Sequence, residues 1–259
     1  MAWTSGSFAS NAAGRIITLF DTVLVANAHW TIYDAAAGAN AKVYECADAG
    51  ENCLFYVYVG NNAAGYAIIE LWEGWDAGAH AGTGASLKAV GASITLKITY
   101  GAGGYGISVR DHCFIWQNYA GDNGAYVGQP RRKDTSKNIV LYCGPGNAPG
   151  GNALGLPGSN EANAWGTLFD EVGNKVYVGN GAGDCGGPTR VKTIAGEIEL
   201  RETPLTNLTT LLIMGEMEGV ASYPNTNAGI VTGDTAVIDG VTWRANAVYS
   251  TNLTFVEQA

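Results

Sequence analysis

Charged residues are scarce in this sequence. Asp, Glu, Lys and Arg make up 14% of the 259 residues, whereas ordinary soluble domains contain roughly 25%. The net charge is −9, and non-specific binding of nucleic acid needs a basic face. We therefore expect no nucleic-acid partner. A surface with so few charged groups favours coverage by neighbouring proteins in an assembly. A stable secreted or thermophilic β protein is the alternative.

A long hydrophobic run is also missing. No stretch approaches the roughly 18 apolar residues of a membrane-spanning helix, so we expect no membrane partner. The opening MAWTSGSFAS has neither the positive region nor the apolar run of a signal peptide. We expect synthesis in the cytoplasm without export.

Cysteine and histidine are few and lack the spacing of metal ligands. The chain has five Cys and three His, with no CxxC or HxxxH, and we expect no metal and no cofactor. Cys46 and Cys53 flank the loop ADAGEN of an expected hairpin, which makes a cross-strand disulfide conceivable. Reduced, buried thiols are the alternative for a cytosolic product.

One amphipathic helix is followed by segments that read as strands. Residues 12–26 carry an apolar face at helical spacing, made by Ile16, Leu19, Phe20, Val23 and Leu24. Apolar and polar residues then alternate through HWTIYD, AKVYEC, LFYVYVG, YAIIELW and ITLKITY. The pattern predicts an α+β, mostly β fold: an antiparallel sheet or sandwich with one N-terminal helix packed on it.

Glycine and proline divide the chain. Residues 144–164 contain Pro145, Pro149 and Pro157 among many glycines, as expected of a linker or a long surface loop. We therefore predict an N-terminal domain at 1–143, beginning with an extended arm at 1–11, and a C-terminal β-rich region at 165–259. Residues 76–92 read as a loop, and Asp239-Gly240 predicts a tight hairpin turn.

One glycine-rich segment offers a catalytic interpretation. Gly183-Asp184-Cys185-Gly186-Gly187-Pro188 resembles the nucleophile loop of chymotrypsin-like proteases, with Cys185 in place of serine. The available bases are His29, His80 and His112, and none has the sequence context of that family's base. A structural glycine turn is favoured, so we expect no catalytic residues and no enzyme.

Aromatic and basic residues supply candidates for an interface or a ligand site. Tryptophan rings stack on sugars, but they also anchor cores and interfaces. Adjacent arginines in a loop are typical of a solvated turn or an intersubunit salt bridge. The candidates are Trp72, Trp75, Trp116, Trp165, Arg131 and Arg132.

The first half of the chain resembles virion structural proteins of tailed bacteriophages. The resemblance lies in the opening Met-Ala-Trp-Thr-Ser-Gly, the helix, the Ala-His-Trp-Thr-Ile strand that follows it, and the later run Cys113-Phe114-Ile115, Tyr119-Ala120-Gly121 and Gln129-Pro130-Arg131-Arg132. It implies a self-associating tail, neck or baseplate component in the virion, with other virion proteins as partners. A carbohydrate-binding module that contacts a host surface glycan is the alternative, and a cysteine protease using Cys185 is the second alternative.

Overall fold

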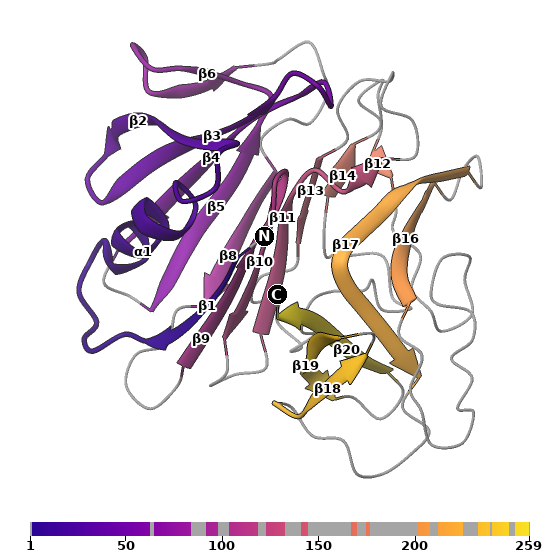
Figure 1. Ribbon diagram of the computed structural model, residues 1–259. Coiled ribbons are helices and arrows are strands. Elements are labelled where there is room, and N and C mark those ends of the chain that lie inside the picture. Colours follow the sequence, from indigo (N-terminus) through magenta and orange to yellow (C-terminus); the bar gives the residue numbers. More distant parts are fainter. Residues whose placement is uncertain are drawn as a thin grey trace, which may run out of the picture.

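A computed structural model describes thirteen stretches of the chain: residues 2–62, 65–83, 92–97, 104–118, 123–132, 141–144, 167–169, 175–176, 201–207, 212–224, 233–238, 240–248 and 252–258. Within them the fold is mostly β, with antiparallel sheets and one helix (Figure 1). This confirms the predicted class. The described residues contain no helix with the length and apolarity needed to cross a bilayer.

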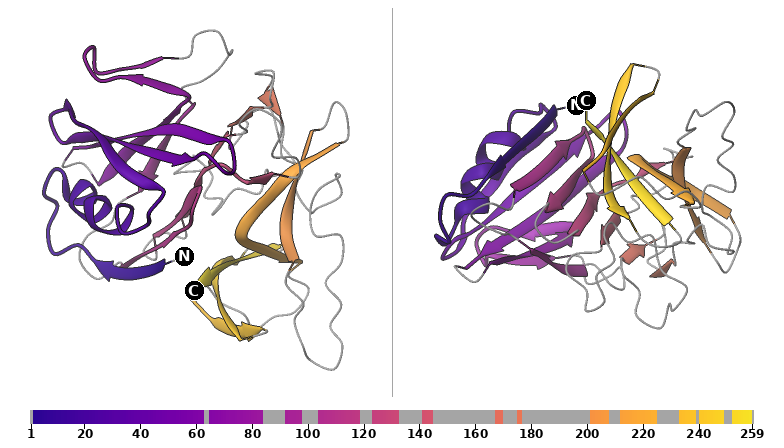
Figure 2. Two further views of the ribbon diagram at one scale, coloured as in Figure 1. Left: turned by 45° about the horizontal axis from the view of Figure 1, so that its top comes forward. Right: turned by 90° about the horizontal axis from the view of Figure 1, so that it is seen from below.

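Three main sheets lie across the molecule, mostly purple, magenta and yellow in turn, although the N-terminal β1 belongs to the second and β12 to the third (Figure 2). The first has the order β2 (Trp30–Gly38), β3 (Ala41–Asp48), β4 (Cys53–Asn61), β5 (Tyr66–Trp72), β8 (Ala92–Lys97). The second has the order β1 (Ala2–Ser7), β9 (Gly104–Val109), β10 (Cys113–Asn118), β11 (Asn123–Gly128), β13 (Leu141–Gly144), β14 (Thr167–Phe169), β15 (Lys175–Val176). The third has the order β12 (Arg131–Arg132), β17 (Leu212–Pro224), β20 (Asn252–Gln258), β19 (Val241–Val248), β18 (Thr235–Ile238), with β16 (Arg201–Asn207) also paired to β17.

The helix α1 (Arg15–Val23) is shorter than the predicted segment because Gly14 precedes it with a positive φ of 76°. No side chain of its own first turn caps it. Instead the Ile16 N–H donates to Asn61 Oδ1 at 3.3 Å, from the end of β4. Of the apolar face, Ile16, Phe20 and Leu24 are fully buried, and Leu19 is partly buried.

The main core lies where α1 and the first two sheets meet. Phe20 contacts Phe114 of β10 edge to face, with ring centroids 5.1 Å apart. Trp30 of β2 packs against both Phe55 and Phe114, and its indole N–H donates to the Arg110 carbonyl at 2.8 Å. Aromatic burial thus joins the first sheet to the second.

A small hairpin covers part of the other face of the first sheet. β6 (Gly74–Asp76) pairs with β7 (Ala81–Thr83), so the start of the segment predicted as a loop at 76–92 is strand. Its Trp75 packs with Val43 and Tyr56 of the sheet. At the predicted turn, β18 and β19 form a hairpin in which Ile238 pairs with Val241; Asp239 lies outside the described residues.

Strands on both sides of the predicted linker share sheets. β14 and β15 join the sheet of β1, whereas β12 joins the sheet of β17. The division at 144–164 remains a prediction. The segment predicted as an arm is extended, but its residues 2–7 pair with β9 of the same chain. The two chain ends lie close together in all views (Figures 1 and 2).

Candidate functional site

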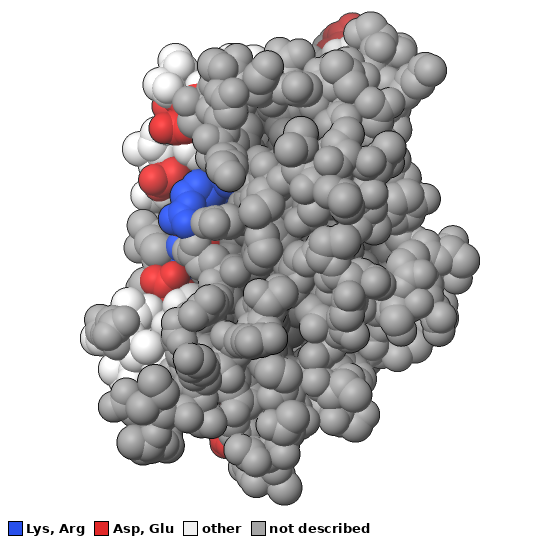
Figure 3. Space-filling view, turned by 90° about the vertical axis from the view of Figure 1, so that its right-hand side faces the viewer, with Lys and Arg blue, Asp and Glu red and all other residues white. Residues whose placement is uncertain are grey.

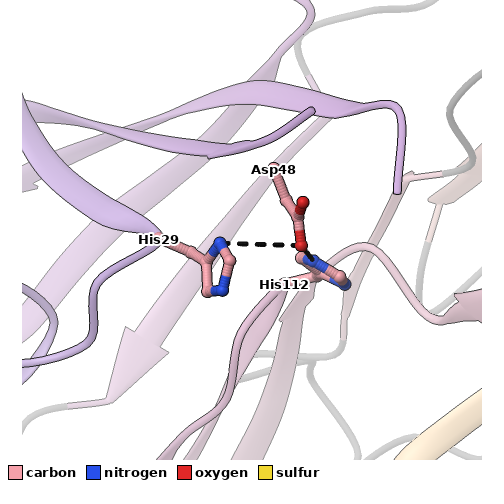
Figure 4. Close-up of side chains that lie close together, drawn as sticks. All are labelled: His29, Asp48 and His112. Atoms are coloured by element: carbon pink, nitrogen blue, oxygen red, sulfur yellow. Dashed lines mark hydrogen bonds and ion pairs between the residues drawn. The ribbon is translucent and has the colours of Figure 1, made fainter. Parts of the chain in front are cut away.

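His29, Asp48 and His112 meet where the first two sheets adjoin (Figure 4). His29 immediately precedes β2, Asp48 ends β3, and His112 lies in the turn between β9 and β10. Asp48 Oδ2 is 2.9 Å from His112 Nε2 and 3.6 Å from His29 Nδ1. One donor atom from each side chain lies within 4.8 Å of the other two.

The two oxygens of Asp48 have different partners. Oδ1 accepts the backbone N–H groups of Gly50 at 2.8 Å and Glu51 at 3.3 Å, so the β3–β4 turn fixes the carboxylate. Oδ2 is therefore directed at the imidazoles. The hydrogen bond from His112 lowers the pKa of Asp48 below its ordinary value and outweighs the opposing effect of burial.

Further hydrogen bonds hold the two imidazole-bearing segments opposite each other. Asn27 Oδ1 accepts the His29 backbone N–H at 2.9 Å, and Asn27 Nδ2 donates to Asp111 Oδ1 at 3.0 Å. The Cys46 thiol donates to the Asp111 carbonyl at 3.2 Å. Asn27 thus ties the turn before β2, and Cys46 ties β3, to the β9–β10 turn.

A second histidine–aspartate pair lies on the outer face of the first sheet. The buried Asp34 Oδ2 accepts the Trp75 indole N–H at 2.9 Å and lies 2.8 Å from His80 Nδ1. Asp34 Oδ1 accepts the Ala36 N–H at 2.9 Å. This pair holds the β6–β7 hairpin against the sheet.

The predicted tryptophan candidates do not form one group. Trp116 is 1% exposed and stacks on Tyr105 in the main core, so it is unavailable to a ligand. Trp75 is also buried, whereas Trp72 is half-buried and donates its N–H to Glu70. Trp165 lies outside the described residues.

The predicted arginine loop is a short strand. Arg131 and Arg132 form β12, in register with Glu216 and Gly215 of β17, and Arg131 is exposed. This segment is a strand and not a loop because its main chain pairs with β17, which is distant in the sequence. The local sequence does not reveal that pairing. On the side of the molecule that carries this sheet, the described basic side chains gather in one small group flanked by acidic ones (Figure 3).

The conceivable disulfide between Cys46 and Cys53 is not formed, because both cysteines are free and buried. Cys46 pairs with Phe55, and Cys53 pairs with Asp48. The two cysteines are therefore diagonal neighbours, about 7–8 Å apart in such a ladder, and a disulfide favours Cα separations of about 4.4–6.8 Å. Cys185 lies outside the described residues.

The histidine–aspartate cluster is not predicted by the sequence, which offers His29 and His112 only as bases for Cys185 and predicts no metal ligands. Asp48 and His112 are 64 residues apart, and only the packing of two sheets brings them together. No local spacing signals such a site. Comparison with protein-family models and with curated proteins finds no match for this chain.

Proposed function

We propose that the chain is a structural virion protein of a tailed bacteriophage, which binds copies of itself and neighbouring tail, neck or baseplate proteins. The resemblance of its first half supports this proposal, as does the small number of charged residues. The structural observation that supports it best is the cluster of aromatic side chains on the outer face of the first sheet.

This outer aromatic face presents Tyr33, Tyr58, Ile68 and Trp72, which are at least partly exposed, around the buried Tyr56. The ring centroids of Tyr33 and Tyr56 are 4.8 Å apart, and Tyr58 stacks on the nearby Trp75. Ile68 is 49% exposed and Tyr33 42% exposed. Tyr and Trp are enriched at the centres of protein interfaces, and charged residues are depleted there.

The first test is the state of association in solution. We expect sedimentation velocity at rising concentration to show species larger than a monomer, and Ile68→Asp to shift them toward the monomer. Val237→Asp is the matched control, because Val237 is 69% exposed on β18 of another sheet. A wild-type protein that stays monomeric at high concentration and is absent from purified particles would overturn the proposal.

The same face supports the alternative of carbohydrate binding. Glu70 accepts from the Trp72 indole, and Glu45 hydrogen-bonds the Tyr56 hydroxyl. Aromatic rings beside carboxylates suit a sugar, since rings stack on its apolar face and carboxylates accept its hydroxyls. A glycan array with wild type and Trp72→Ala separates the two functions: a specific signal lost in the variant favours the carbohydrate-binding module.

A further inference from the structure

We propose that His29, Asp48 and His112 form a binding site for a divalent first-row transition metal ion, with Zn²⁺ as the best-fitting ion. This site goes beyond the proposed virion role and does not depend on it. Since the spacing of Cys and His in the sequence predicts no metal, this site reverses that expectation.

The geometry is close to that of a tetrahedral site. Zinc lies about 2.0–2.1 Å from histidine nitrogen and carboxylate oxygen, so tetrahedral ligands are roughly 3.3 Å apart. The separations from Asp48 Oδ2 are 2.9 Å to His112 Nε2 and 3.6 Å to His29 Nδ1. These two values bracket the requirement, and the third pair, His29 Nδ1 and His112 Nε2, lies within 4.8 Å. Side-chain rotations that bring the two nitrogens toward each other would complete a tetrahedral arrangement.

The donor set selects the class of metal. Two imidazole nitrogens and one carboxylate oxygen suit Zn²⁺, Co²⁺ or Ni²⁺. Ca²⁺ and Mg²⁺ prefer shells made of oxygen. Each imidazole binds as a neutral ring with its proton on the opposite nitrogen, Nε2 of His29 and Nδ1 of His112. Without the ion, His112 Nε2 donates to Asp48 Oδ2 and His29 Nδ1 donates to the Ala47 carbonyl at 3.3 Å. Binding therefore moves each ring's proton to its other nitrogen and releases His29 from Ala47, with no net loss of protons from neutral rings.

The surroundings already orient the ligands. The β3–β4 turn occupies Asp48 Oδ1 and leaves Oδ2 for the ion. Asn27 and Asp111 tie the segments that bear the two histidines. Partners of this kind orient metal ligands and tune their affinity.

The partial exposure of the ligands and their positions on two sheets indicate how the ion would act. The side chains of His29, Asp48 and His112 are 33%, 20% and 18% exposed, so a fourth position is open to water. Because the ligands come from two sheets, the ion cross-links them. Binding to the folded state alone then stabilises the fold.

The test uses the full chain, purified with a tag that lacks histidine and treated with chelator. Zn²⁺ is titrated by calorimetry and Co²⁺ by visible absorption. We expect one equivalent of Zn²⁺, a tetrahedral Co²⁺ spectrum and a higher Tm with Zn²⁺. Loss of an outer partner of a metal ligand costs roughly 10–100-fold in affinity, so His29→Gln and His112→Gln should each lose more than about 100-fold.

A control variant makes the test specific. His80→Gln alters a histidine whose aspartate partner is Asp34, outside the cluster, and it should bind like wild type. Circular dichroism checks that every variant folds. Equal Zn²⁺ affinity in wild type and in the two ligand variants would overturn the proposal, as would a thiolate-to-cobalt charge-transfer band, which would assign the ion to cysteine.

Discussion

At the scale of single residues, Asp34 is the clearest determinant of stability. Burial raises the pKa of Asp34, but hydrogen bonds from His80, Trp75 and Ala36 outweigh burial and leave the pKa below its ordinary value. The unfolded chain, with a carboxyl pKa of about 3.9, then takes up the proton first. The stabilisation is present above that pH and is lost as the pH falls through the lower folded pKa.

We therefore expect Asp34→Asn to lower the free energy of unfolding by about 2 kcal/mol at pH 7, the value of hydrogen bonds to a charged group. The deficit relative to wild type should shrink as the pH falls below about 4. Urea denaturation followed by tryptophan fluorescence at pH 7, 4 and 3 measures both quantities. A deficit that stays constant over this range would contradict the assigned role of the carboxylate.

The buried cysteines give a second residue-scale prediction. Burial raises the pKa of the Cys113 thiol to about 12 and also raises the pKa of Cys46. Since the thiolate is the reactive form, iodoacetamide at neutral pH should leave Cys46, Cys53 and Cys113 unmodified in native protein and label them in denaturant. Peptide mass spectrometry reads each site. The same labelling experiment tests the protease alternative, because a nucleophilic cysteine would react. An unlabelled Cys185 in native protein would exclude the protease.

At the scale of elements, the β6–β7 hairpin depends on a close approach between Gly82 and the Trp72 ring. A Cβ at residue 82 would overlap the indole, so Gly82→Ala should displace the hairpin and cost about 1–3 kcal/mol, as overpacking does. Gly78→Ala is the control, since its Cβ meets only an exposed Asp76 oxygen, at 3.3 Å. Urea denaturation compares the two variants.

A Trp72→Ala background provides the decisive comparison for this hairpin. The three atoms nearest to the new Cβ all belong to the indole, so the cost of Gly82→Ala should largely disappear in the double-mutant cycle with Trp72→Ala. An unchanged cost would mean that the backbone at Gly82 rather than the ring limits the position.

The sequence predicts elements where the signal is local and misses them where it is not. The period of α1 and the Asp239-Gly240 signal for a hairpin are local patterns, and both the helix and the β18–β19 hairpin formed. The helix start depends on Asn61 from another strand, and β12 depends on pairing with β17. The metal-ligand cluster is harder still, because His29, Asp48 and His112 share no local pattern and meet only when two sheets pack.

At the scale of the whole molecule, Arg110 ties the N-terminal half to the C-terminal sheet. Its guanidinium is 2% exposed and donates to Glu218 at 2.9 Å and to Glu257 at 2.6 Å, from β17 and β20. Its main-chain carbonyl accepts from Trp30 of the first sheet. One residue thus contacts strands of the first and third sheets from the end of the second.

We expect Arg110→Met to be the most disruptive of these substitutions, because it leaves two carboxylates without their cation. Breaking a buried ion pair costs about 3–5 kcal/mol. Glu218 is 33% exposed, and its exposure should reduce the loss to about 2–4 kcal/mol. Arg110→Lys keeps the charge but not the two-pronged geometry and should fall between, as denaturant unfolding would measure. A loss that vanishes in Arg110→Met when both glutamates are also changed to glutamine would assign the cost to the stranded carboxylates. A loss that persists would assign it to the packing of the arginine stem between the sheets.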